Sequence, residues 1–117
     1  TNRLVGSEMC IRDSLKAAVS GCEDVIHCAA ALYIGAKDVK RDVVDPSVIG
    51  TQNLCSVMGG VKRIVHTSSV AAIRSTRFEN GKVFSKEDWC DDATETRNAY
   101  GFAKAQAERI MRDWAKR

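Results

Sequence analysis

The chain has 117 residues, of which 44% are hydrophobic and 28% charged, and its formal net charge at pH 7 is +3. This composition is typical of a globular domain and excludes a disordered tail or a collagen-like chain, while the length allows one domain at most. Acidic and basic residues are interspersed without a basic stripe, which argues against nucleic-acid binding, and no apolar run is long enough to span a membrane.

Residues 1–14 show no pattern typical of a structural element. Within them, residues 4–14 match, without a gap, one reading frame of a transposase-type adapter used to prepare sequencing libraries. We therefore expect residues 1–14 to be a non-native, adapter-derived segment, and the start of the natural domain to be missing.

From residue 15 onward the pattern alternates between helix and strand. Residues 15–20 predict the end of a helix, which Gly21 stops because glycine readily adopts the left-handed conformation that follows a helix. Residues 24–30 form a short apolar run with the length of a buried strand and end in small side chains. A loop or ragged helix start is expected at 32–41.

Residues 43–58 predict a further helix, with Pro46 in its first turn, where the missing N–H is tolerated. A second short, β-branched strand is expected at 64–67, followed by a long polar irregular stretch at 70–96 and a helix at 100–116. The apolar sides expected of these two helices are Val44, Val48, Leu54, Val57 and Met58 in the first and Ala103, Ala107, Ile110, Met111 and Trp114 in the second.

The predicted fold is α/β, because apolar strands without alternation that lie between helices indicate a parallel sheet covered on both faces. In open sheets of this type, ligands bind outside the carboxyl ends of the strands. Residues 28–30 and 67–69 follow the two predicted strands there. Small side chains at 28–30 would let a flat cofactor approach the backbone, although close helix–sheet packing also explains Ala29 and Ala30 and is, by itself, the simpler reading.

Tyr100 and Lys104 carry the clearest chemical signal, since residues four apart share one face of a helix. An ammonium beside a phenol favours the phenolate. A hydroxyl from the strand-end segment Thr67-Ser68-Ser69 could hold a carbonyl next to that phenol. Together these groups would form a general acid/base site for hydride chemistry, whereas the pair alone also fits a partly exposed helix face.

Histidine and cysteine give no metal pattern. His27 and His66 lie within apolar runs, so we expect core histidines that each make a hydrogen bond. The five cysteines have irregular spacing and no Cys-x-x-Cys, which argues against a zinc site. Their odd number and the lack of a secretory signal favour reduced thiols and a cytoplasmic location. Cys55 is expected to be a small buried apolar residue.

Four motifs follow one another in a specific order and spacing: residues 24–30, 48–54, 61–73 and 100–104. Through them the chain resembles the extended short-chain dehydrogenases/reductases of the NAD-dependent epimerase/dehydratase superfamily. More narrowly, it is similar to their dihydroflavonol reductase-like and 3β-hydroxysteroid dehydrogenase-like branch. The resemblance covers residues 15–117 and implies the central part of a Rossmann-type, doubly wound parallel sheet.

The resemblance also implies roles for individual residues. Ser69, or with less support Ser68, corresponds to the catalytic serine, Tyr100 to the tyrosine that protonates the substrate oxygen, and Lys104 to the lysine that also binds the nicotinamide ribose. Hydride would pass between NADP or NAD, with NADP favoured, and a small-molecule carbonyl substrate. The residues implied to line the cofactor are Cys28, Ala29, Ala30, Thr67, Ser68, Tyr100 and Lys104.

Some parts of the family pattern are absent. The sequence contains no Gly-x-x-Gly-x-x-Gly loop for the pyrophosphate and no substrate domain after the last helix, so we expect an inactive fragment of an enzyme whose full-length form could pair as a homodimer. Ser47 replaces an asparagine of some relatives. Residues 87–89, Glu-Asp-Trp, are either a solvated loop with one anchoring aromatic or an edge of the substrate site.

Two alternative functions stay open on sequence grounds. One is a nucleotide-sugar epimerase or dehydratase, which shares the same serine, tyrosine and lysine. The other is a non-enzymatic dinucleotide-sensing protein. The segments 87–89 and 69–73 favour a reductase over the first, and the presence of the whole acid/base set argues against the second.

Overall fold

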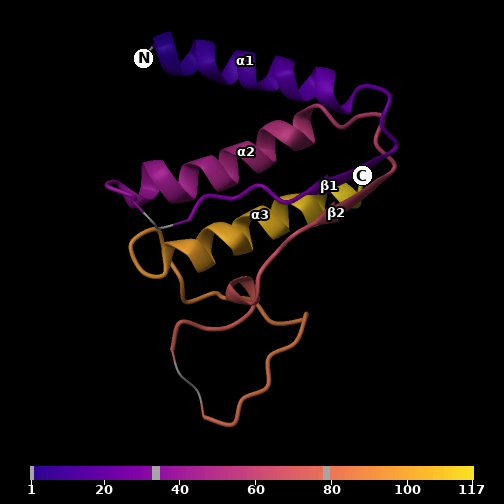
Figure 1. Ribbon diagram of the computed structural model, residues 1–117. Helices are drawn as coiled ribbons and strands as arrows, with labels where there is room; N and C mark the ends of the chain where they lie inside the picture. Colours follow the sequence, from indigo (N-terminus) through magenta and orange to yellow (C-terminus); the bar gives the residue numbers. More distant parts are fainter. Residues whose placement is uncertain (1, 33–34, 78–79) are drawn as a thin grey trace.

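The computed structural model describes residues 2–32, 35–77 and 80–117, with side chains from residue 11 onward. In chain order the elements are α1 (Asn2–Val19), β1 (Asp24–His27), the π-helix η1 (Lys40–Val44), α2 (Asp45–Ser56), β2 (Arg63–His66), the 3-10 helix η2 (Val70–Ala72) and α3 (Ala99–Ala115) (Figure 1). β1 and β2 pair in parallel, with Asp24 opposite Arg63 and His27 opposite His66. The predicted α/β class and parallel pairing are confirmed.

The N-terminal segment is helical, so the expectation that it forms no structural element is wrong for residues 2–14. The segment contains no proline and a single glycine, Gly6, and the side chains of Leu15 and Val19 anchor the end of α1 on the core. Gly21 follows with a φ of 77°, the left-handed conformation predicted there. The adapter origin of residues 1–14 stays a prediction.

Both strands end earlier than predicted. β1 ends at His27 instead of Ala30, and β2 at His66 instead of Thr67. One further backbone bond follows, in which Thr67 N donates to His27 O at 2.9 Å. The residues at 28–30 and 67–69 therefore lie just beyond the carboxyl ends of the strands, where the predicted site requires them.

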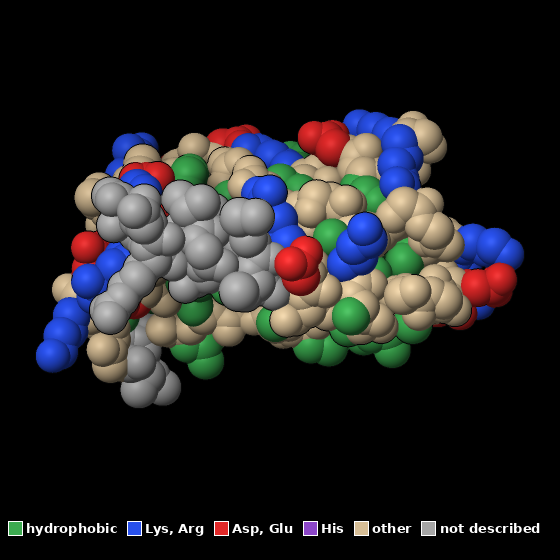
Figure 2. Space-filling model, turned by 90° about the horizontal axis from the view of Figure 1, so that it is seen from above, with side chains coloured by type: hydrophobic (Ala, Val, Ile, Leu, Met, Phe, Trp, Pro, Cys, Tyr) green, Lys and Arg blue, Asp and Glu red, His purple; other side chains and the backbone are tan. Residues whose placement is uncertain are grey.

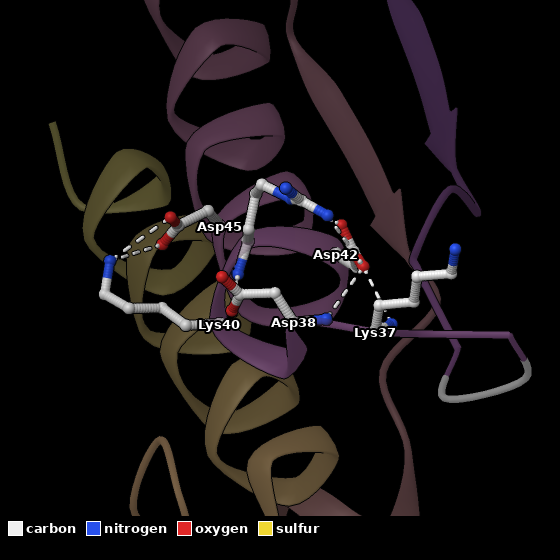
Figure 3. A network of polar contacts seen from close by, with 6 residues as sticks. Lys37, Asp38, Lys40, Asp42 and Asp45 are labelled. Atoms are coloured by element: carbon white, nitrogen blue, oxygen red, sulfur yellow. Dashed lines mark hydrogen bonds and ion pairs between the residues drawn. The ribbon is translucent and has the colours of Figure 1, made fainter.

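Asp42 fixes the connection that leads from β1 into α2 (Figure 3). Its Oδ2 accepts hydrogen bonds from the backbone N–H groups of Lys37 at 3.0 Å and Asp38 at 3.1 Å, and its Oδ1 accepts one from Arg41 Nε at 2.9 Å. The bond from Arg41, followed by those from the two backbone groups, lowers the pKa of Asp42 to about 2. With its start held in this way, the helical run begins at η1, ahead of the predicted 43.

One face of the sheet carries the core. Val25 and Ile64 pack against a cluster of Leu54, Met58, Val61 and Met111, to which α1 adds Leu15 and Val19. On the opposite face, Ile26 and Val65 remain 71% and 61% exposed. The expectation of helices on both faces is therefore wrong for the described part of the chain, because α1, α2 and α3 all pack on the same side.

The apolar sides predicted for α2 and α3 are largely correct. The buried members are Val44, Leu54, Met58, Ala103, Ala107 and Met111, while Val48, Val57, Ile110 and Trp114 are partly buried. Figure 1 shows α1, α2 and α3 side by side, with the loop between η2 and α3 extending away from them. On the face shown in Figure 2, basic and acidic side chains are interspersed. Among the described residues, no helix is both long and apolar enough to cross a membrane.

Candidate active site

The first turn of α3 is built to approach η2 closely. Asn98 precedes the helix with a left-handed φ of 53°, and its Oδ1 accepts a hydrogen bond from Gly101 N at 3.2 Å. A Cβ on Gly101 would lie 2.9 Å from Asn98 Cγ and 3.0 Å from the carbonyl oxygen of Ala71. Only glycine leaves this contact unstrained, so Gly101 packs directly on η2, the short helix that follows Ser69.

Lys104 links α3 to the end of β2. Its side chain is buried, with 5% of the residue exposed, and Nζ donates a hydrogen bond to the carbonyl oxygen of Thr67 at 2.9 Å. The hydroxyl of Thr67 in turn donates to Cys28 Sγ at 3.4 Å. The structure thus brings together Lys104, Thr67 and Cys28, which the sequence predicts as site residues from three separate segments.

The two serines at the strand end have different environments. Ser69 caps η2, with its Oγ accepting a hydrogen bond from Ala71 N at 3.1 Å, so its own O–H proton stays available for donation. Ser68 Oγ is buried and has no hydrogen-bond partner among the described residues. Within the described residues, the hydroxyl groups of both Ser69 and Ser68 therefore keep a proton for donation to a ligand.

His27 and His66 face each other at the ends of the strands, with ring centroids 5.3 Å apart. His27 Nε2 donates to Thr51 Oγ1 at 3.3 Å, which confirms the hydrogen bond expected of this residue. Both ring nitrogens of His66 are buried without a partner in the described part of the chain, so that expectation is wrong for His66. Sequence position gives the strand of a residue but not the groups that lie opposite its side chain.

Both imidazoles are held neutral. Burial, followed by the charges of His27 and Lys104, lowers the pKa of His66 to about 4, and Glu108 acts weakly in the opposite direction. Burial, followed by the charge of Lys104, also lowers the pKa of His27. Near neutral pH, neither imidazole therefore adds a positive charge beside Lys104.

Two sets of contacts hold the long loop before α3. Asp92 accepts hydrogen bonds from Thr76 N at 2.9 Å and Thr76 Oγ1 at 2.6 Å, and these bonds are the main reason that the pKa of Asp92 falls to about 2. The Trp89 ring lies beneath the guanidinium groups of Arg109, at 4.4 Å, and Arg112, at 5.1 Å. Of the two readings of residues 87–89, these contacts support the loop with an anchoring aromatic.

Two cavities adjoin the predicted site residues. One of about 240 Å³ lies between η2, the following residues and the start of α3, and is lined by Val70, Ala71, Arg74, Ser75, Thr76 and Asn98. Another of about 400 Å³ lies between α1, α2 and the segment after β1, and Ala29 and Ala30 line it. The small residues predicted to admit a cofactor therefore do border open space, although Cys28 is not part of that lining.

The sequence analysis missed Asn98 and Gly101. Asn98 was detectable, because asparagine is a preferred residue at a helix start. The need for glycine at 101 was not, since it depends on the carbonyl of Ala71, which a distant segment supplies.

A sequence profile described as the NAD dependent epimerase/dehydratase family matches residues 1–117. The chain belongs to this family. An anthocyanidin reductase of Arabidopsis thaliana is 28% identical over 97% of the chain and 36% of that relative. A cinnamoyl-CoA reductase of Medicago truncatula is 37% identical over 64% of the chain and 24% of that relative, and a dihydroflavonol 4-reductase of Hordeum vulgare is 30% identical over 87% of the chain and 31% of that relative. The resemblance seen in the motifs is thereby confirmed.

Solved structures agree with the fold. The yeast methylglyoxal/isovaleraldehyde reductase Gre2, complexed with NADPH, superimposes with a TM-score of 0.77 and is 26% identical, covering 91% of this chain and 34% of the reductase. A Gre2 from Candida albicans gives a TM-score of 0.73 at 22% identity, over 91% of this chain and 34% of that protein. The chain spans about a third of the length of these relatives, and its fold corresponds to part of a Rossmann-type domain.

Proposed function

We propose that the whole protein is a nicotinamide-dependent oxidoreductase that interconverts a carbonyl and an alcohol through Ser69, Tyr100 and Lys104. The observation that carries the proposal is the bond between buried Lys104 Nζ and the carbonyl of Thr67. It joins the helix with the Tyr-x-x-x-Lys pattern to the strand end with the Thr-Ser-Ser run. Chance occurrence of either pattern would not require this contact.

The protein's own groups have separate tasks. One N–H of the Lys104 ammonium donates to the carbonyl oxygen of Thr67, and the remaining N–H groups would bind the ribose hydroxyls of the cofactor. Tyr100 lies one turn earlier on the same face of α3. Tyr100 would give a proton to the substrate oxygen as negative charge develops, while the Ser69 hydroxyl donates a hydrogen bond to the same oxygen.

NADP is the preferred cofactor of this proposal, because the yeast reductase that resembles the chain was solved with NADPH. When bound, its nicotinamide supplies or accepts the hydride. The described residues fit the nicotinamide end: a buried ammonium with spare donors in Lys104, the exposed Thr67 and Cys28, the buried Ser68 hydroxyl without a partner, and the open space beside Ala29 and Ala30.

A reductase is favoured over a sugar-nucleotide epimerase because the relatives named above are reductases. It is favoured over a dinucleotide sensor because a sensor needs no acid/base set. A small-molecule carbonyl substrate and a cytoplasmic location, predicted from the reduced cysteines, complete the proposal.

The test is the substitution Tyr100→Phe in the whole protein, assayed by aldehyde- and ketone-dependent oxidation of NADPH and NADH. Loss of a general acid lowers kcat by roughly 10²- to 10⁴-fold. The Kd for NADPH, measured by fluorescence, should stay nearly unchanged and serves as the control for folding. Unchanged turnover in the Tyr100→Phe protein would refute the assignment.

A further inference from the structure

The cavity of about 240 Å³ beside η2 is lined in part by polar side chains that already donate hydrogen bonds inside the protein. The Ser75 hydroxyl donates to Arg77 O at 2.8 Å, and the Thr76 N–H and hydroxyl both donate to Asp92. Asn98 donates from Nδ2 to Cys90 Sγ at 3.8 Å. The O–H protons of this lining are thus already used inside the protein.

Arg74 differs from these neighbours. Its backbone N–H donates to Val70 O at 2.9 Å, which fixes its position at the end of η2. Its exposed guanidinium makes no hydrogen bond or ion pair with the part of the chain that the structure describes. A guanidinium presents up to five donors in a planar fork that matches a carboxylate.

Asp92, the acid in this hydrogen-bond network, forms no ion pair with Arg74 in the described part of the chain. Asp92 is charged above pH values of about 2, but its oxygens accept from Thr76 and from Arg77 N at 3.3 Å and so point into the loop. The cavity therefore combines an apolar wall, formed by Val70 and Ala71, with one uncompensated positive charge.

We propose that Arg74 binds an anionic group of the substrate, so that the protein acts on small oxo acids; this inference rests on the proposed function. Ser69, which would bind the reacting carbonyl, and Arg74 stand at opposite ends of η2. A rise of about 2 Å per residue places the backbones of these two residues on the order of 10 Å apart. The arginine side chain can extend back toward Ser69, so the guanidinium and the serine hydroxyl can lie closer together than that. The carboxylate therefore lies several bonds from the carbonyl, as in a 4-oxo acid.

The experiment compares 4-oxopentanoate with its neutral methyl ester in the whole protein, with NADPH. Arg74→Gln keeps N–H donors but removes the charge, and Arg74→Lys keeps the charge without the planar fork. Arg77→Gln is the control, because Arg77 lines a different cavity. In Arg74→Gln we expect KM for the acid to rise about tenfold, which is the modest effect of losing an exposed charged hydrogen bond. The kcat for the acid, and both KM and kcat for the ester, should stay almost unchanged. Arg74→Lys should recover part of the affinity, and Arg77→Gln should behave like the wild type.

Binding is also measured without turnover, as equilibrium dialysis of the acid into the dead-end complex with NADP⁺. Binding that is about tenfold weaker in Arg74→Gln supports the inference even where turnover is slow. The inference is overturned if the wild type binds acid and ester equally well, or if the ratio of the two affinities is the same in Arg74→Gln as in the wild type. Either result leaves the reductase function intact. If the acid binds only when Arg74 is present but the protein reduces no carbonyl compound, the reductase function is overturned and the anion site is kept.

Discussion

The close contact between Gly101 and Ala71 leads to a prediction with opposing energy terms. The substitution Gly101→Ala removes a poor helix former, which by itself stabilises a helix by about 1 kcal/mol. The new Cβ, however, would lie 3.0 Å from a backbone carbonyl that belongs to η2 and 2.9 Å from Asn98 Cγ. Overpacking of this kind costs about 1–3 kcal/mol, and a disturbed helix cap costs about 1 kcal/mol more.

The expected balance is a net loss of roughly 1–3 kcal/mol in the free energy of unfolding, measured by urea denaturation of the whole protein. Activity should fall further than stability, because a displacement of about 1 Å at Tyr100 can lower turnover roughly 10²-fold. The matched control is Gly50→Ala in α2, where a new Cβ meets nothing within 4 Å and stability should stay equal or rise. If Gly101→Ala were as stable as Gly50→Ala and as active as the wild type, the close approach of α3 to η2 would not be needed.

Two further predictions concern pH and the loop. His66 has a folded pKa of about 4, below its ordinary 6.5, so its contribution to stability is present above pH 6.5 and is lost as pH falls toward 4. The melting temperature should therefore drop over this window in the wild type and drop less in His66→Phe; parallel curves would contradict the neutral, buried state. In Asp92→Asn, weaker bonds to Thr76 should free the loop, so that limited trypsin digestion cleaves after Arg77 faster than in the wild type. An unchanged cleavage rate would show that Asp92 does not hold the loop.

The elements of the core could be predicted because their signals are local. The apolar spacing of α3, the proline at the start of α2 and the β-branched run of β2 are properties of neighbouring residues, and they indicate the helices, the strands and the parallel pairing. The helix over residues 2–14 was not predicted, because its sequence has no regular apolar spacing and only the scarcity of glycine and proline favours a helix there.

The features that could not be predicted depend on contacts between distant segments. No local sequence pattern indicates that His66 is neutral. None indicates that Asp92 accepts a hydrogen bond from Thr76, which lies 16 residues away in the chain. The exposed side of the sheet was also not predictable, because apolar strands such as those at Ile26 and Val65 look alike whether one face or both are covered.

Lys104 shows why a proposed set of site residues could, by contrast, be predicted from the sequence. A buried ammonium is costly unless its donors are satisfied, and within the described residues Lys104 Nζ has one hydrogen-bond acceptor, the carbonyl of Thr67. The nearby His27 and His66 are neutral near pH 7 and so add no repulsive positive charge. In the proposed function, the hydroxyl groups of the cofactor would accept hydrogen bonds from the remaining donors of Lys104, so this role would require partners at fixed spacing. Tyr100 lies one helical turn before Lys104 and the two serines directly follow Thr67, and this fixed spacing is what makes the proposed set recognisable in the amino-acid sequence.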